Sequence, residues 1–151
     1  MVVMPWLSEP RIQNHEEALL LPPLLDLLRA TGRVRESTLV VSEFPWNGRR
    51  VDLATLSVTR TTSAYELKLA SFQRALEQAM YNRLSFDRSW IVTRGLPKQT
   101  GLLQAAENGI GVMTLDGASM RILVLARPQQ RSRTVRARLV AKLQAERSKS
   151  V

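Results

Sequence analysis

The sequence predicts an α/β fold, a mixed central sheet flanked by helices, and three observations lead to this prediction. A leucine-rich helical pattern precedes three strand-like segments, and two of these are joined by Asn47-Gly48, a strong hairpin signal. A second helical pattern and a strand of the buried type follow. A shorter helix, a final strand pair and a basic segment complete the chain, so the expected order is helix, three strands, helix, strand, helix, two strands.

The first helix is expected over residues 14–30, because Asn14 is a typical cap and Glu17 follows three residues later, as in a capping box. Pro22-Pro23 should kink or split this helix, since proline removes a donor and crowds the preceding turn. A loop then leads into a three-strand meander. Its strands are rich in β-branched and aromatic residues and are expected at residues 38–46, 49–58 and 64–70.

The second half of the chain alternates helical and strand patterns. Residues 71–86 keep a helical period, with Ser71 in the cap position. Residues 87–94 form the next expected strand, and a short helix over residues 97–109 should end at Gly109. The final strand pair is expected on either side of Asp116-Gly117, a second hairpin signal, at residues 110–117 and 120–128.

Composition limits the classes of protein that this chain can represent. Its 151 residues, 44% of them hydrophobic, suit one globular domain with its own core. The absence of cysteine excludes a disulfide framework and a thiolate metal site. No apolar run reaches the roughly 20 residues that span a bilayer, and the start "MVVMPWLSEP" lacks the features of a signal peptide. We therefore expect a cytoplasmic protein without a membrane partner.

The net charge of +9 is concentrated at the C-terminus, which divides the chain into a domain at residues 1–126 and a basic tail at residues 127–151. The tail holds eight Lys or Arg against one acid, whereas the rest holds 14 against 12. Apolar residues recur in the tail at helical spacing. A basic helix of this kind fits phosphate binding, a membrane surface or a solvated end, and we favour nucleic acid.

The stretch "AYELKLA", residues 64–70, places two opposite charges on one face of an expected strand, Glu66 and Lys68. An exposed ion pair would explain them. However, the chain has 18 arginines and four lysines, and Lys68 is the only lysine among the first 97 residues. Because the compact ammonium of lysine suits proton handling and point contact with an anion, Lys68 is a candidate catalytic residue.

Asp52 interrupts the neighbouring strand "VDLATL", where a lone carboxylate would be costly unless it were satisfied. Two carboxylates on adjacent strands, Asp52 and Glu66, can share Mg²⁺ or Mn²⁺, and Lys68 can then orient water or stabilise developing negative charge. The spacing therefore favours phosphodiester hydrolysis.

At this point the chain resembles the PD-(D/E)XK, or restriction endonuclease-like, nuclease superfamily. Asp52 and Glu66-Leu67-Lys68 match its D…(D/E)-x-K signature, and Glu66-Leu67-Lys68 is the sole D/E-x-K triplet here. The match covers the core of helix, meander, helix and strand at about residues 14–94. The resemblance implies Mg²⁺-dependent cleavage of DNA, or less often RNA.

The resemblance also implies roles for individual residues. Asp52 and Glu66 would be metal ligands, with the Leu67 carbonyl as a further ligand and Lys68 as the catalytic cation. Members often add a Glu from the first helix, here Glu17 or otherwise Glu16, and a Gln from the helix after the E-x-K strand, here Gln78. Tyr81 follows Gln78 by three residues, whereas the Q-x-x-x-Y element of helicase-linked and phage-exonuclease members spaces the pair by four.

Nucleic-acid contacts are expected from the hairpin tip, the second helix and the tail. The predicted contact residues are Arg49, Arg50, Tyr81, Arg131, Arg133, Arg136, Arg138 and Lys142. Glu43 is either a further ligand or an ion-pair partner of Arg49 or Arg50, and Asp87 is expected to be a turn residue.

Two other classes of protein remain open from the sequence. One is a nucleic-acid-binding module, or a partner subunit of a larger nuclease assembly, that kept the fold without turnover. The other is a basic ribosome- or membrane-associated scaffold, in which the two acids would be incidental. If the chain cuts both strands of a duplex, a homodimer is favoured, because one small domain carries one site.

Overall fold

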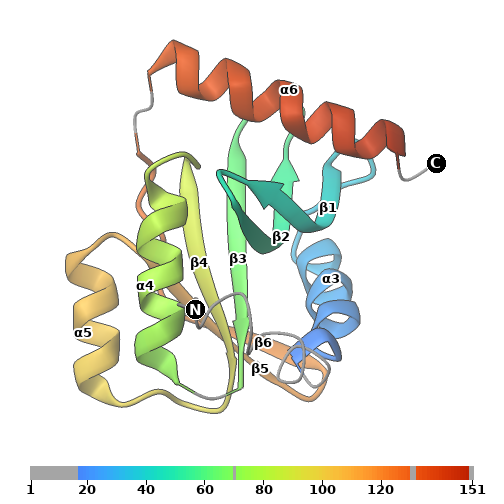
Figure 1. Cartoon of the computed structure of the whole chain (residues 1–151). Coiled ribbons are helices and arrows are strands. Elements are labelled where there is room, and N and C mark those ends of the chain that lie inside the picture. Colours follow the sequence, from blue (N-terminus) through green and yellow to red (C-terminus); the bar gives the residue numbers. More distant parts are fainter. Residues whose placement is uncertain (1–16, 70, 130–131, 150–151) are drawn as a thin grey trace, which may run out of the picture.

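The computed structural model of the chain describes residues 17–69, 71–129 and 132–149. Its six strands form one sheet in the order β1-β2-β3-β4-β5-β6. The strands are β1 Leu39–Trp46, β2 Arg49–Leu56, β3 Thr62–Lys68, β4 Arg88–Arg94, β5 Gly111–Asp116 and β6 Ser119–Val124. The helices, labelled as in Figure 1, are α3 Leu21–Ala30, α4 Phe72–Arg83, α5 Gln99–Glu107 and α6 Arg133–Lys149. The mixed α/β architecture expected from the sequence is confirmed.

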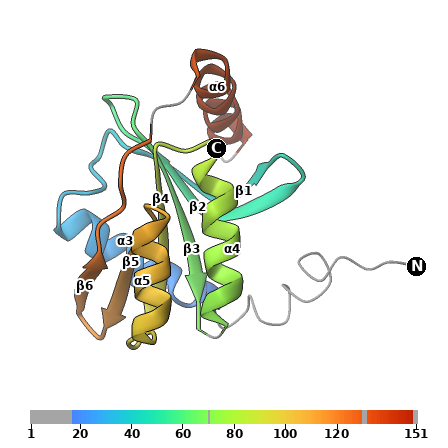
Figure 2. The ribbon, with the colours of Figure 1, turned by 90° about the vertical axis from the view of Figure 1, so that its left-hand side faces the viewer.

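The sheet contains both kinds of strand pairing. Strands β1, β2 and β3 form the expected antiparallel meander. Strands β3, β4 and β5 are parallel, and β6 returns antiparallel to β5. Helices α4 and α5 connect the parallel strands and lie side by side against the sheet (Figure 2). Parallel strands need such crossovers, and the crossovers bring the start of each helix close to the end of the preceding strand.

Local sequence signals explain two boundaries of these elements. Asn47 and Gly48 both have positive φ, 52° and 75°, as a tight hairpin turn of this type requires. Residues 17 and 18 are helical, a turn follows, and α3 begins with the Pro22-Pro23 pair in its first turn. The proline pair therefore splits the expected first helix, because proline is tolerated in a first turn but not in a helix interior.

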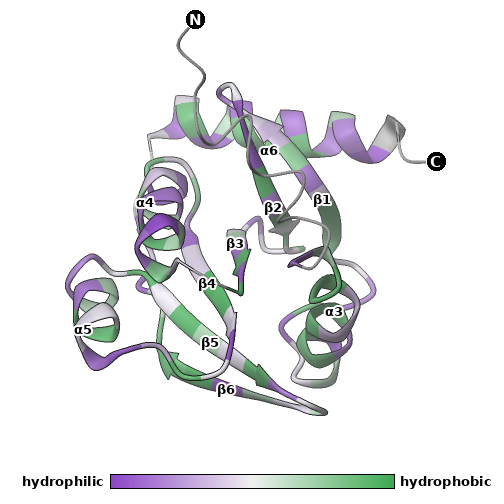
Figure 3. Cartoon of the chain, turned by 60° about the horizontal axis from the view of Figure 1, so that its bottom comes forward, coloured by the Kyte–Doolittle hydropathy of each residue, from purple (hydrophilic) through white to green (hydrophobic). Residues whose placement is uncertain are grey.

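Each face of the sheet has its own hydrophobic cluster. Leu24 and Leu28 of α3 are fully buried against one face, which includes Leu53 and Trp90. Helices α4 and α5 cover the other face through small and aliphatic side chains packed on Ile91. Figure 3 shows that hydrophobic residues run along β4 and β5, as expected for strands covered on both sides.

The basic helix α6 packs on β1 and β2 through Leu139, Val140 and Leu143, which are buried. The expected amphipathic helix is therefore present, and its apolar side is part of the core. Within the described ranges no helix, α6 included, is both long and apolar enough to cross a bilayer.

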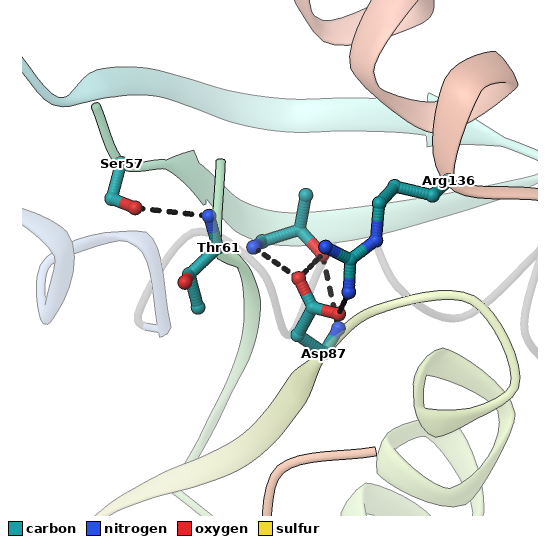
Figure 4. A network of polar contacts seen from close by, with 5 residues as sticks. Ser57, Thr61, Asp87 and Arg136 are labelled. Atoms are coloured by element: carbon teal, nitrogen blue, oxygen red, sulfur yellow. Dashed lines mark hydrogen bonds and ion pairs between the residues drawn. The ribbon is translucent and has the colours of Figure 1, made fainter. Parts of the chain in front are cut away.

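A polar network attaches α6 to the sheet (Figure 4). Asp87, expected as a turn residue, is 5% exposed and accepts hydrogen bonds from the Thr62 amide at 2.8 Å and the Thr62 hydroxyl at 3.1 Å. The guanidinium of Arg136 forms an ion pair with the same carboxylate. Arg136 therefore joins the start of α6 to the beginnings of β3 and β4.

Candidate functional site

The two carboxylates singled out in the sequence face each other across β2 and β3. Leu53 pairs with Tyr65, and one further step of this antiparallel register sets Asp52 opposite Glu66. Oδ2 of Asp52 accepts a hydrogen bond of 2.8 Å from the Leu67 amide, so the carboxylate is turned toward β3. A second hydrogen bond links the carboxyl groups of Asp52 and Glu66 to each other. One of the two must hold a proton for that bond to form.

Burial explains why this carboxyl pair retains a proton. Glu66 is only 2% exposed, and burial raises its pKa well above the ordinary value of 4.5. The charge of Asp52 and the hydrogen bond to it raise the pKa of Glu66 further. Burial also raises the pKa of Asp52, while hydrogen bonds from Glu66 and the Leu67 amide oppose that shift. The pKa of Glu66 is therefore raised more strongly than that of Asp52, so Glu66 is the group of the pair that binds a proton more readily.

Asn82 of α4 completes the surroundings of Glu66, and no sequence pattern singled it out. Its side-chain amide is buried and donates a hydrogen bond of 2.9 Å to Oε1 of Glu66. Asn82 stands four residues after Gln78, the spacing at which two helical side chains share a face. That spacing is the one sequence signal that could have found it.

Lys68 lies at the end of β3, where it forms an ion pair with Glu17 and its charge lowers the pKa values of Asp52 and Glu66. Its Nζ is 3.8 Å from Oε2 of Glu17, and the side chains of Lys68 and Glu17 are 11% and 8% exposed. Burial raises the pKa of Glu17, and the charge of Lys68 opposes that shift. Oε1 of Glu17 is buried without a hydrogen-bond partner among the described residues. The spare candidate Glu16 lies outside the described residues.

The second helix contributes Gln78 and Tyr81. Gln78 is half-buried, and its Oε1 has no hydrogen-bond partner in the described part of the chain. Tyr81 is 51% exposed, and the guanidinium carbon of Arg49 lies 3.6 Å from its ring centre. This cation–π contact joins the β1–β2 hairpin to α4.

The remaining predicted nucleic-acid contacts occupy varied surroundings. Arg50 lies 3.9 Å from Glu43, so the ion-pair alternative for Glu43 is the one found. In α6, Arg133 is exposed, Arg138 lies over the Trp46 ring, and Lys142 pairs with Glu146. Arg131 lies outside the described residues. Arg136, Arg138 and Lys142 thus already have intramolecular partners, whatever else they bind.

The donor set around Asp52 and Glu66 fits a hard divalent cation in part. In the described ranges, no group of three or more His, Asp or Glu side chains is arranged to hold a metal. Mg²⁺, however, is typically bound through one or two carboxylates, with waters and substrate phosphates completing its shell. Two facing carboxyls, together with the unpartnered oxygens of Glu17 and Gln78 nearby in the fold, offer oxygen donors only. Asp52 and Glu66 therefore suit Mg²⁺ or Mn²⁺ rather than a zinc-type centre.

Comparison with known proteins defines the fold and leaves the activity open. No family model and no curated protein matches the chain. Among solved structures, it is similar to a protein of unknown function from Silicibacter pomeroyi, with a TM-score of 0.65 and 22% identity. The match covers 85% of this chain and 83% of the other. At this level of identity the similarity shows a shared fold.

Proposed function

We propose that this chain is a metal-dependent nuclease that hydrolyses phosphodiester bonds of nucleic acid, with DNA as the expected substrate, on a restriction endonuclease-like core. One observation carries the proposal: buried Glu66 and half-buried Asp52 form a carboxyl pair across two adjacent strands, and a lysine stands two residues beyond Glu66. Buried titratable groups with displaced pKa values are concentrated at functional sites.

A divalent cation would resolve the electrostatic conflict in this pair. Two facing carboxylates cannot both ionise cheaply here, and the pKa values of Asp52 and Glu66 are both raised. In the proposal, Asp52 and Glu66 hold the cation, with the Leu67 carbonyl as a further ligand. The bound cation would neutralise phosphate charge and lower the pKa of an attacking water. Metal binding must therefore displace the proton from Glu66.

The other residues position charge around the reacting phosphate. Lys68 provides a cation that orients the attacking water or stabilises the negative charge that develops on the phosphate oxygens. Glu17 pairs with Lys68 at 3.8 Å and so helps to hold it in place. Asn82 fixes one oxygen of Glu66, which leaves the other oxygen of Glu66 directed to Asp52. Gln78, one turn before Asn82 on α4, has a side-chain oxygen without a hydrogen-bond partner among the described residues.

The test is a cleavage assay with labelled single-stranded, duplex and branched DNA and with RNA, in Mg²⁺, Mn²⁺ or EDTA. Asp52→Asn keeps the size of the side chain and removes the charge that would bind metal. Asp26→Asn is the matched control, because Asp26 is an exposed aspartate on α3. We expect metal-dependent cleavage by the unmodified chain and by Asp26→Asn, and a loss on the order of 10²–10³-fold for Asp52→Asn.

Two results would contradict the proposal. Cleavage by Asp52→Asn at the unmodified rate would show that the carboxyl pair is not the catalytic centre. Salt-sensitive binding without cleavage on any substrate would favour the inactive binding module, because phosphate contacts alone produce that salt dependence.

A further inference from the structure

An open pocket of about 280 Å³ adjoins the candidate site at the edge of the sheet where parallel strands end. Strands β3 and β4 end at this edge, and α4 and α5 begin there (Figures 1 and 2). The residues that line it include Lys68, Ser71, Phe72, Arg94, Pro97 and Lys98. Ligands of α/β proteins commonly bind beyond the carboxyl ends of the strands.

The charges of the pocket all have one sign. Lys68, Arg94 and Lys98 contribute three cations, and the described residues that line the pocket include no Asp or Glu, although Glu17 pairs with Lys68 at 3.8 Å from outside the lining. Lys68 is mostly buried, while Arg94 and Lys98 are exposed and free to adjust to a ligand. A concave surface whose cations outnumber the acids near it favours an anion.

Both helices that border the pocket begin without a side-chain cap. Neither Ser71 before α4 nor Lys98 before α5 caps the helix with its side chain, and neither helix has an acid in its first turn. Lys98 is an unfavourable residue at this position, because the start of a helix carries partial positive charge. An anion in the pocket would relieve that repulsion and accept hydrogen bonds from the uncapped backbone amides.

The loop that forms one wall of the pocket is fixed by hydrogen bonds. The Gly95 amide donates to the Thr114 hydroxyl at 3.0 Å, and the Gly95 carbonyl accepts from the Thr93 hydroxyl at 2.9 Å. Gly95 has a φ of 95°, which other residues rarely adopt. The wall is therefore formed before any ligand binds.

Lys68 belongs both to this pocket and to the candidate site. It stands two residues beyond Glu66 on β3, about 7 Å along the strand at the usual rise per residue. A phosphate held in the pocket would therefore lie close to the scissile bond on the same strand.

We propose that the pocket is a phosphate subsite, which holds a phosphate of the substrate strand close to the scissile bond through Arg94, Lys98 and Lys68. This inference rests on the proposed function, because it takes nucleic acid as the substrate. The bound group is either an internal backbone phosphate or a phosphate at a strand end.

The test measures binding of fluorescent single-stranded oligonucleotides in EDTA, so that cleavage plays no part. The oligonucleotides carry a 5′-phosphate, a 3′-phosphate or hydroxyl ends. Arg94→Ala combined with Lys98→Ala should weaken binding about 3- to 10-fold and lower the slope of log K against log salt by about 0.7 for each phosphate that the variant no longer neutralises. Arg121→Ala, an exposed arginine on β6, is the matched control and should bind as the unmodified chain does.

A second variant separates binding from folding. Lys98→Asp introduces a favourable helix cap, so we expect its melting temperature to rise while its affinity falls. A preference for 5′- or 3′-phosphorylated strands that disappears in the double variant would identify a terminal phosphate as the ligand. An equal loss of affinity for all three strands would identify a backbone phosphate.

Different results would contradict the phosphate subsite and the proposed nuclease activity. Unchanged affinity and salt slope in both pocket variants would overturn the subsite, even if the chain cleaves nucleic acid. Phosphate-dependent binding through Arg94 and Lys98 without any cleavage would support the subsite and contradict the nuclease.

Discussion

Replacing Glu66 by glutamine should remove most of the pH dependence of stability that the carboxyl pair creates. Glu66 binds a proton more tightly in the folded chain than in the unfolded one, because its pKa is raised above 4.5 by folding. At pH values between 4.5 and the raised pKa, the folded chain therefore carries a proton on Glu66 that the unfolded chain has largely lost. Stability then falls as the pH rises through that interval, by about 1.4 kcal/mol for each pH unit per such group. For a chain of this size, that is about 3–6 °C in melting temperature per pH unit.

The glutamine should fit the same position. Its amide NH₂ can donate to Asp52 where the protonated carboxyl donates now, and its oxygen can accept from Asn82. We therefore expect the melting temperature to change less for Glu66→Gln than for the unmodified chain between pH 5 and pH 7, and the raised pKa values of Asp52 and Glu17 to cause the pH dependence that remains.

The assay is thermal unfolding followed by circular dichroism across this pH range, in EDTA and in Mn²⁺. Glu77→Gln, an exposed glutamate on α4, is the control and should retain the pH dependence of the unmodified chain. Mn²⁺ should stabilise the unmodified chain more at pH 8 than at pH 6, because it must displace a proton, and it should stabilise Glu66→Gln little. A Glu66→Gln protein that keeps the full pH dependence would refute the shared-proton account.

Three further predictions concern the stability of the fold. Arg136→Ala should lower the free energy of unfolding by about 1–3 kcal/mol, because the buried Asp87 loses its cationic partner. Urea titrations measure this change, and an unchanged urea midpoint would show that the pair does not contribute to stability. Leu143→Ala should cost about 2–5 kcal/mol, because α6 is packed into the core, and a cost under about 1 kcal/mol would mean that it is only loosely attached. Gly111→Ala should lower the free energy of unfolding by about 1–3 kcal/mol or more, because an added Cβ would lie 2.3 Å from the Trp90 ring. Its melting temperature should fall accordingly, and an unchanged melting temperature would contradict the tight packing.

Much of the fold was predictable because its signals are local. The Asn47-Gly48 turn and the proline pair each fix a boundary through their own backbone preferences. The short turn at residues 57–61 brings β2 beside β3, so the placement of Asp52 across from Glu66 follows from strand alternation and the order of the elements.

Other features depended on tertiary packing, which local patterns do not encode. No pattern in the sequence around Asn82 indicates that its side chain contacts Glu66. The contact exists because α4 packs on β3. Asp87 precedes a strand and looks like a turn residue, yet it is buried because α6 returns from 49 residues away to place Arg136 on it. Likewise, the contact of Arg49 with Tyr81 depends on how far the hairpin bends over α4.

The pocket beside Lys68 is bordered by a helix start whose residue is unfavourable for a helix. Lys98 places a positive charge at the start of α5 and does not cap the helix, although acids and capping side chains are preferred there. Residues that are unfavourable for the local structure often lie at functional sites. No single stretch of the sequence predicted this pocket, because its cations come from the ends of two strands and the start of a helix.

The central claim is that Asp52, Glu66 and Lys68 form a catalytic centre, and single-turnover cleavage by Lys68→Ala tests it most directly. Mn²⁺ binding is measured on the same samples, and Arg121→Ala, an exposed arginine on β6 outside the predicted nucleic-acid contacts, is the control. We predict that Lys68→Ala binds Mn²⁺ but cleaves on the order of 10²-fold more slowly or not at all, while Arg121→Ala cleaves at a rate close to that of the unmodified chain. Metal-dependent cleavage by Lys68→Ala at the unmodified rate would contradict the account.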